Sequence, residues 1–190
     1  MPEYRRIECP GATIFFTVVT HRRRPILSDS RSVGLLRQAF REELDHHPFS
    51  IDAAVILPDH LHCIWTLPDN DNRFSMRWTK IKGRFTELFL AAGGIEADRG
   101  ASRCKRGERG VWQRRFWDRV IRDDDEFGVY MDYIHYNPVK HGHTLCPHAW
   151  PYSSFHRCVQ AGTYAADWLC ACRSQAQAPN FAAIGDRVGE

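Results

Sequence analysis

The sequence predicts an α+β fold: a ferredoxin-like, split βαβ antiparallel sheet with helices on one face, plus an extra helix that carries Tyr133. Seven patterned segments follow one another in the order strand, helix, strand, strand, helix, strand, helix. The third and fourth are separated only by Pro58-Asp59, a dipeptide typical of tight turns, which predicts a hairpin. The length of 190 residues, with 43% hydrophobic side chains, fits one domain with an appendage and excludes fibrous and wholly disordered classes.

The first four elements lie in the first third of the chain. Residues 12–20 are dense in β-branched and aromatic side chains, which predicts a strand. Residues 30–43 place apolar side chains three and four positions apart, which predicts an amphipathic helix. The runs 49–57 and 60–67 are short, apolar and rich in β-formers, so we expect them to be the two strands of the hairpin.

The remaining elements alternate with basic segments. Residues 76–92 have helical periodicity, whereas residues 96–110 have none and predict a mobile loop. Residues 111–121 favour a strand, and residues 123–136 favour a helix that begins with acidic side chains and ends before Pro138. From residue 145 the periodicity is weak, which indicates a tail packed on the domain.

The charge of the chain is concentrated in one region. Residues 73–122 contain 14 Lys and Arg against 5 Asp and Glu, although the whole chain carries only +3. Such a basic stretch is typical of a protein that binds a polyanion. A solvated helix face followed by a charged loop explains the charge equally well.

The cellular environment is predicted from absent signals and from cysteine usage. The N-terminal residues lack an apolar stretch behind a basic one, and no apolar run approaches the roughly 20 residues that span a bilayer, so we expect a cytoplasmic protein and no membrane partner. The seven cysteines are odd in number and scattered, which predicts thiols rather than disulfides.

His60-Leu61-His62 begins the second hairpin strand. Because side chains alternate along a strand, His60 and His62 are expected on one face and Leu61 on the other. Two imidazoles close together can chelate a divalent metal ion. A pair of exposed or hydrogen-bonded histidines without metal is the alternative.

The last predicted helix carries a second group of chemically capable residues. Tyr133 and Asn137 are four positions apart and share a helix face, with Tyr130 one turn earlier. An asparagine shortly before Pro138 is commonly only a C-terminal cap, and tyrosines at helical spacing are commonly core.

Taken together, these motifs resemble the single-tyrosine transposases with a His-hydrophobic-His motif, and most closely the REP-associated tyrosine transposases, which are bacterial proteins linked to repetitive extragenic palindromes. The matching segments, in chain order, are Pro10-Gly11-Ala12, Leu57-Pro58-Asp59-His60-Leu61-His62, Trp112-Gln113-Arg114-Arg115-Phe116-Trp117-Asp118, Tyr133-Ile134-His135-Tyr136-Asn137-Pro138-Val139-Lys140-His141-Gly142 and Trp150-Pro151-Tyr152-Ser153-Ser154-Phe155. The resemblance implies a catalytic domain over residues 1–157, with its mobile basic loop at about 96–110, and a C-terminal tail over residues 158–190, packed or partly disordered.

The resemblance also implies a reaction. His60, His62 and Asn137 would hold Mg²⁺ or Mn²⁺, and Tyr133 would attack a phosphate of single-stranded or hairpin DNA, which leaves a 5′-phosphotyrosine and a free 3′-OH. Reversal by a 3′-OH would rejoin strands. The base that takes the tyrosine proton stays open between His135, Lys140 and a metal-bound water, although His135 is expected on another helix face. The protein would act as a monomer or a homodimer.

The basic region then predicts a DNA-binding surface. Its expected members are Arg73, Arg77, Lys80, Lys82, Arg84, Arg103, Lys105, Arg106, Arg109, Arg114 and Arg115. Trp78, Trp112 and Trp117 could stack on bases, but tryptophans in such segments more often belong to the core.

Two other classes of function remain open. One is a non-catalytic nucleic-acid-binding domain on the same fold, which would need the charge but neither His60 nor Tyr133. The other is a zinc module near the C-terminus. Its possible ligands are Cys146, Cys158, Cys170, Cys172, His148 and His156, but paired Cys-x-x-Cys knuckles are absent.

Overall fold

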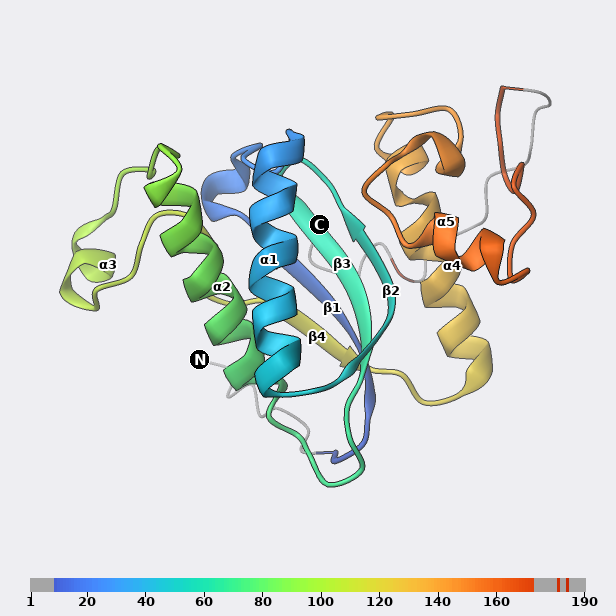
Figure 1. The fold of residues 1–190 in the computed structure, drawn as a ribbon, viewed down its shortest axis with the longest axis horizontal. Helices are drawn as coiled ribbons and strands as arrows, with labels where there is room; N and C mark the ends of the chain where they lie inside the picture. The colour runs from blue at the N-terminus through green and yellow to red at the C-terminus, as the bar shows by residue number, and fades with distance from the viewer. Residues whose placement is uncertain (1–8, 173–180, 182–183, 185–190) are drawn as a thin grey trace.

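The computed structural model describes residues 9–172, 181 and 184. Its centre is a four-stranded antiparallel sheet in the order β2-β3-β1-β4 (Figure 1). The strands are β1 (Thr13–Val19), β2 (Ser50–Ile56), β3 (His60–Thr66) and β4 (Trp117–Val120). β3 lies between β1 and β2, and β4 flanks β1 on its other side. This is the predicted split βαβ arrangement, and the fold class is confirmed.

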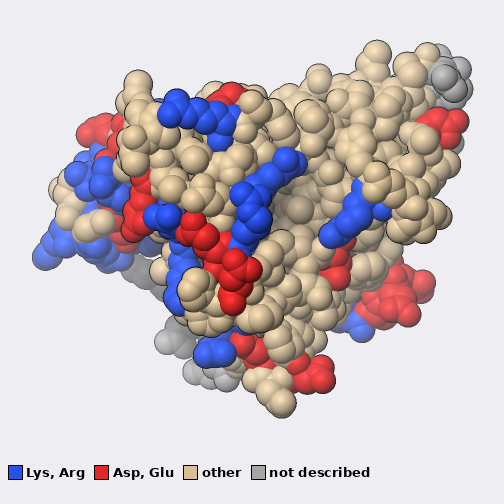
Figure 2. Space-filling view, viewed as in Figure 1, with Lys and Arg blue, Asp and Glu red and all other residues tan. Residues whose placement is uncertain are grey.

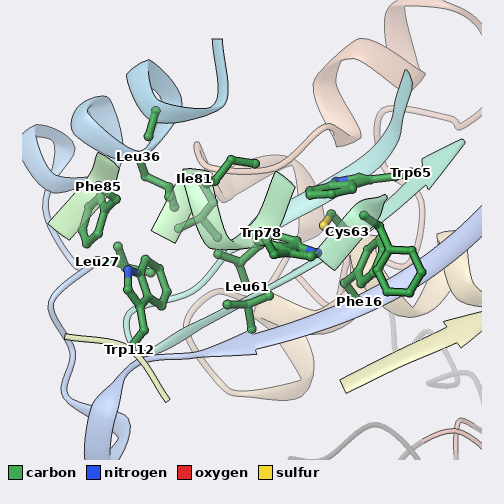
Figure 3. Close-up of a cluster of buried hydrophobic side chains, with 14 of the residues drawn as sticks. Phe16, Leu27, Leu36, Leu61, Cys63, Trp65, Trp78, Ile81, Phe85 and Trp112 are labelled. Atoms are coloured by element: carbon green, nitrogen blue, oxygen red, sulfur yellow. The ribbon is translucent and has the colours of Figure 1, made fainter. Parts of the chain in front are cut away.

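Two long helices, α1 (Ser30–His46) and α2 (Phe74–Ala91), cover one face of the sheet (Figure 1). The α1 helix begins where the Asp29 side chain accepts a hydrogen bond from the Ser32 backbone N–H, which satisfies one of the free donors of the first turn. Between the helices and the sheet lies a core in which Trp65 of β3 stacks on Trp78 of α2 with ring centroids 4.3 Å apart (Figure 3).

The extra helix α4 (Asp124–Lys140) packs on the opposite face of the sheet, where it forms a second core with residues such as Phe15 and Ile64 (Figure 1). The Asp123 side chain accepts from the Glu126 N–H and caps its first turn. The expected end before Pro138 is wrong by one turn, since the helix continues to Lys140. Proline has no backbone N–H, so the helix loses one hydrogen bond at Pro138. The helical pattern continues past it, because the backbone N–H of His141 donates to the Asn137 carbonyl at 3.0 Å.

The segment between α2 and β4 is more ordered than the sequence predicts. It contains the short helix α3 (Ala101–Lys105), and the Glu96 carboxylate accepts from both Arg109 and the Gly110 N–H, which closes the loop. The strand expected over residues 111–121 is confined to β4, because Trp112 forms only an isolated bridge to Thr20.

The chain after α4 packs back onto the second core. It includes two short helices, η2 (Pro147–Ala149) and α5 (Phe155–Gln160), and α5 crosses the expected junction between residues 157 and 158. Cys146 and Cys170 form a disulfide, contrary to the expectation of seven thiols, because this packing brings their Cα atoms to 4.3 Å. No helix in the described segments combines the length and apolarity needed to cross a bilayer.

Candidate active site

The alternation of β3 places its two histidines as predicted. Leu61 enters the core beneath α1 and α2, whereas His60 and His62 lie on the face that α4 covers, with their ring centroids 4.9 Å apart. Both histidines are buried, with 2% and 0% exposure. The alternative of an exposed histidine pair is therefore excluded.

Each of the two imidazoles is oriented through its Nδ1 atom. Nδ1 of His60 lies 2.6 Å from Oδ1 of Asp59, and Nδ1 of His62 lies 3.0 Å from Oγ1 of Thr17 on the neighbouring strand. Burial alone would raise the pKa of Asp59, but the hydrogen bonds and charges of His60 and Arg23 outweigh it and lower the pKa to about 2. A carboxylate that accepts from Nδ1 fixes the tautomer in which Nε2 carries the lone pair that binds metals.

The α4 helix brings the predicted tyrosine and asparagine to the same place. The Tyr133 ring lies 5.3 Å from the His62 ring, and the ring of His141, just past the helix end, lies 5.3 Å from the His60 ring. Asn137 is one turn from each of them, so it shares their helix face, and it is fully buried. The structure thus places His60, His62 and Tyr133 side by side, with Asn137 on the same helix face as Tyr133.

Lys140 is the cation nearest the tyrosine hydroxyl among the contacts of the described residues. Its Nζ donates a hydrogen bond to Oη of Tyr133 at 3.2 Å. His135 instead lies on another helix face, where its Nε2 is 2.9 Å from Oγ of Ser154, and burial lowers its pKa to about 4. This geometry separates His135 from the Tyr133 hydroxyl and leaves Lys140 beside it.

Tyr133 is enclosed as the structure stands. It is 0% exposed, and the ring of Phe181 lies 5.5 Å from its own. The Tyr133 side chain is therefore closed to solvent unless the residues around it move.

Three residues near the site were not predicted from the sequence. Asp59 directly precedes the histidine motif and could have been noticed from that position, and His141 is four residues beyond Asn137. Thr17 is 45 residues from His62, and only the register of β1 against β3 pairs them.

The predicted DNA-binding residues fall into three groups. Arg77 is 1% exposed and bonded to Asp71 and to two backbone carbonyls, so it has a structural role and we leave it out of the DNA surface. The second group has partners within the protein, either carboxylates or backbone carbonyls: Arg73, Lys82, Arg84, Arg103, Arg109 and Arg114. The third group is exposed and forms no ion pair with any described residue: Lys80, Lys105, Arg106 and Arg115.

Lys80 lies between α1 and α2, whereas Lys105 and Arg106 lie at the end of α3. Lys and Arg gather over this part of the molecule, at the left of Figure 2, with acidic side chains among them. A groove of about 750 Å³ lies between α2 and this segment, and its walls include Lys82, Arg103 and Arg114. Trp78 and Trp112 are 1% and 5% exposed, which places both rings in the core.

Arg77→Leu should lower the free energy of unfolding by about 3 kcal/mol, because it leaves the Asp71 carboxylate buried without its main partner. Arg77 lowers the pKa of Asp71 in the folded protein. The stability contributed by the pair is therefore present above the unfolded pKa of about 4 and is lost as the pH falls further. Urea unfolding at several pH values measures both effects. Lys80→Leu is the exposed control, and equal losses in the two variants would contradict the structural role.

Comparison with known proteins identifies the family of the chain. No family model matches the chain. The REP-associated tyrosine transposase of Escherichia coli K12 is 42% identical over 168 residues, which cover 88% of this chain and 91% of that protein. A Haemophilus influenzae protein provisionally given the same name is 41% identical over 170 residues, covering 88% and 93%. The solved structure of a REP-associated tyrosine transposase bound to a REP hairpin matches with a TM-score of 0.74 at 41% identity, covering 88% of this chain and 91% of the other. The chain belongs to the family of REP-associated tyrosine transposases.

Proposed function

We propose that this protein nicks and rejoins single-stranded DNA at the hairpins of repetitive palindromic elements, through a 5′-phosphotyrosine intermediate on Tyr133. The observation that carries the proposal is the placement of the Tyr133 ring 5.3 Å from His62, with Lys140 hydrogen-bonded to its hydroxyl. A nucleophile, a cation beside it and two oriented imidazoles are the parts that phosphoryl transfer to a tyrosine requires. The solved relative bound to a REP hairpin supports the same class of substrate.

His60, His62 and Asn137 would hold a divalent metal ion. The donor set fits, because both imidazoles are anchored at Nδ1 and so offer Nε2, and Asn137 offers an amide oxygen from the adjoining helix face. Two nitrogen donors and one oxygen suit Mn²⁺ better than Mg²⁺, which binds mainly oxygen. When bound, the ion would draw negative charge from the scissile phosphate.

The protein residues account for the remaining chemistry. Tyr133 gives up its hydroxyl proton and its oxygen forms a bond to phosphorus, while the bond from phosphorus to the 3′ oxygen breaks and that oxygen takes up a proton to leave as a 3′-OH. The ammonium of Lys140, 3.2 Å from the tyrosine oxygen, stabilises the phenolate that attacks. Because the phosphotyrosine keeps the energy of the broken bond, attack by a 3′-OH reverses the step without ATP.

One chain supplies the whole centre, since Tyr133 lies against the histidines of its own sheet. This arrangement supports a protein that can act as a monomer, with a homodimer as the alternative. With DNA of a bacterial genome as its substrate, the protein would act in the cytoplasm, and at the nucleoid when it is bound to DNA.

The basic segment is positioned to lead DNA toward the centre. Gln113 donates its backbone N–H to the carbonyl of Val19, and Val19 is the register partner of His60. Arg114 and Arg115 follow Gln113 in the chain, so they begin at the end of the sheet where His60 lies.

The triple variant Lys105→Glu, Arg106→Glu, Arg115→Glu should weaken binding to hairpin DNA by about tenfold or more at 0.1 M salt. Each lost phosphate contact should also reduce the slope of log affinity against log salt by about 0.7. Fluorescence anisotropy with a labelled hairpin, measured across salt concentrations, reports both quantities. Arg31→Glu, Arg37→Glu, Arg41→Glu makes the same charge change on α1 and is the control. If both triple variants lose affinity equally, net charge rather than this surface governs binding.

A further inference from the structure

Four side chains that can bind metals meet beyond the end of α4, apart from the histidine pair of β3. Cys146 and His148 come from the segment around η2, and Cys170 and Cys172 come from the segment after α5. The ligand atoms of Cys146, His148 and Cys170 all lie within 4.8 Å of one another. The sulfur of Cys172 lies 3.1 Å from that of Cys146 and 2.7 Å from that of Cys170.

A disulfide accounts for only part of this cluster. The bond between Cys146 and Cys170 involves two of the three sulfurs, while Cys172 is a free cysteine in contact with both. The imidazole of His148, which is in the same segment as Cys146, lies close to the sulfurs of Cys146 and Cys170. Three cysteines and one histidine around a common centre are the ligand set of structural zinc sites.

The backbone holds the two segments together independently of the sulfurs. The N–H of Ala171, the residue after Cys170, donates a hydrogen bond to the carbonyl of Leu145, the residue before Cys146, at 3.0 Å. Oγ1 of Thr144 accepts from the N–H of Cys146, which fixes the start of the first segment. Cys146 and Cys170 are each 4% exposed, whereas His148 and Cys172 lie at the surface. The ligands are thus preorganised on two short segments, with one side open for an ion to enter.

We propose that Cys146, His148, Cys170 and Cys172, with the disulfide reduced, bind one Zn²⁺ as a structural site. Reduction takes two electrons and two protons from a dithiol reductant and yields two thiols; zinc then displaces the thiol protons as the thiolates bind. Around a tetrahedral ion with Zn–S distances of about 2.3 Å, neighbouring sulfurs lie about 3.7 Å apart. The exposed Cys172 therefore has to move its sulfur by roughly an ångström or less from the other two. Once their bond is reduced, the sulfurs of Cys146 and Cys170 separate by rotation of their side chains.

Such a site would fasten the segment that follows the tyrosine helix. The α4 helix packs against η2, and η2 contains His148. A zinc ion would join residues 146–148 to residues 170–172 and thereby hold the end of α4 that carries Lys140 and His141. This inference does not rest on the proposed nicking reaction.

Metal analysis of the full-length protein tests the proposal. The protein is purified with a dithiol reductant, supplied with ZnCl₂, desalted and analysed by mass spectrometry for metals; we expect one zinc per chain. Cys172→Ser should lose the ion, and because Cys172 is exposed and free this variant should fold. His148→Ala leaves the three thiolates, so it should bind Co²⁺ more weakly than the parent protein and with shifted visible bands, because water replaces the imidazole.

The controls separate this cluster from other metal ligands. Cys104→Ser and His156→Ala remove an exposed thiol and an exposed imidazole outside the cluster and should keep the zinc. The double variant His60→Ala, His62→Ala should keep it too, because its ligands belong to the other centre. Substoichiometric zinc in the reduced parent protein, zinc retained by Cys172→Ser, or a disulfide that persists in excess dithiol would each overturn the proposal.

Discussion

Tyr133→Phe is expected to abolish the covalent adduct between this protein and single-stranded hairpin DNA, and to reduce strand cleavage by roughly a thousandfold or more. The substitution removes only the hydroxyl that attacks phosphorus, and the buried ring stays in place against His62. A 5′-phosphotyrosine keeps the DNA on the 3′ side of the cut. DNA labelled at its 3′ end should therefore migrate with the protein on a denaturing gel in the presence of Mn²⁺, whereas DNA labelled at its 5′ end should be released.

Two neighbouring tyrosines provide matched controls. Tyr130 is buried against Phe15, with ring centroids 4.6 Å apart, and Tyr136 lies 5.9 Å from the ring of Phe181. Tyr130→Phe and Tyr136→Phe should both retain the adduct. An adduct that persists in Tyr133→Phe would assign the nucleophile elsewhere. Tight hairpin binding by the parent protein with no adduct under any condition would favour the non-catalytic DNA-binding domain.

The features predicted from the sequence are those that depend on local periodicity. Alternation along one strand places His60 and His62 opposite Leu61, and the spacing of four on one helix places Tyr133 and Asn137 together. The hairpin follows from one turn dipeptide at Pro58. Each of these inferences uses residues a few positions apart, so no knowledge of the tertiary structure is required.

The features that escaped prediction depend on distant segments. Arg77 looks like one more cation of a basic helix, but the carbonyls of His47 and Pro48, about thirty residues earlier, help to enclose it. Thr17 meets His62 only through strand register. The sequence offered six residues for a zinc module, but their spacing does not show which of them converge, and only the structure brings Cys146, His148 and Cys170 together.

The basic region also shows why charge in a sequence overstates a binding surface. Six of the eleven expected cations already bond to carboxylates or backbone carbonyls within the protein, and one is buried. Around α3, such contacts of Arg103, Arg109 and Arg114 stabilise the segment itself. The same guanidinium groups would have to give up these partners to bind DNA phosphates. The exposed Lys105, Arg106 and Arg115 are therefore the more informative targets.

His60→Ala and His62→Ala are each expected to reduce cleavage by about a thousandfold, equivalent to about 4 kcal/mol of transition-state stabilisation, while hairpin binding persists. In the proposed mechanism, affinity comes from the basic surface around α3, whereas the two imidazoles beneath α4 would act on the scissile phosphate. Chelation with EDTA should reproduce the loss, and added Mn²⁺ should restore the parent protein but neither variant. Cleavage and anisotropy assays on the same preparations separate the two effects.

A buried histidine outside the centre makes this test specific. His135 is 0% exposed like His62, but it bonds to Ser154 on another face of α4. His135→Gln should lower the melting temperature and leave cleavage per folded molecule intact. His60→Ala and His62→Ala should instead lose cleavage and keep most of their thermal stability. If His60→Ala and His62→Ala also lose mainly thermal stability and still cleave DNA, the two histidines are structural residues. The metal ligands would then have to be sought elsewhere.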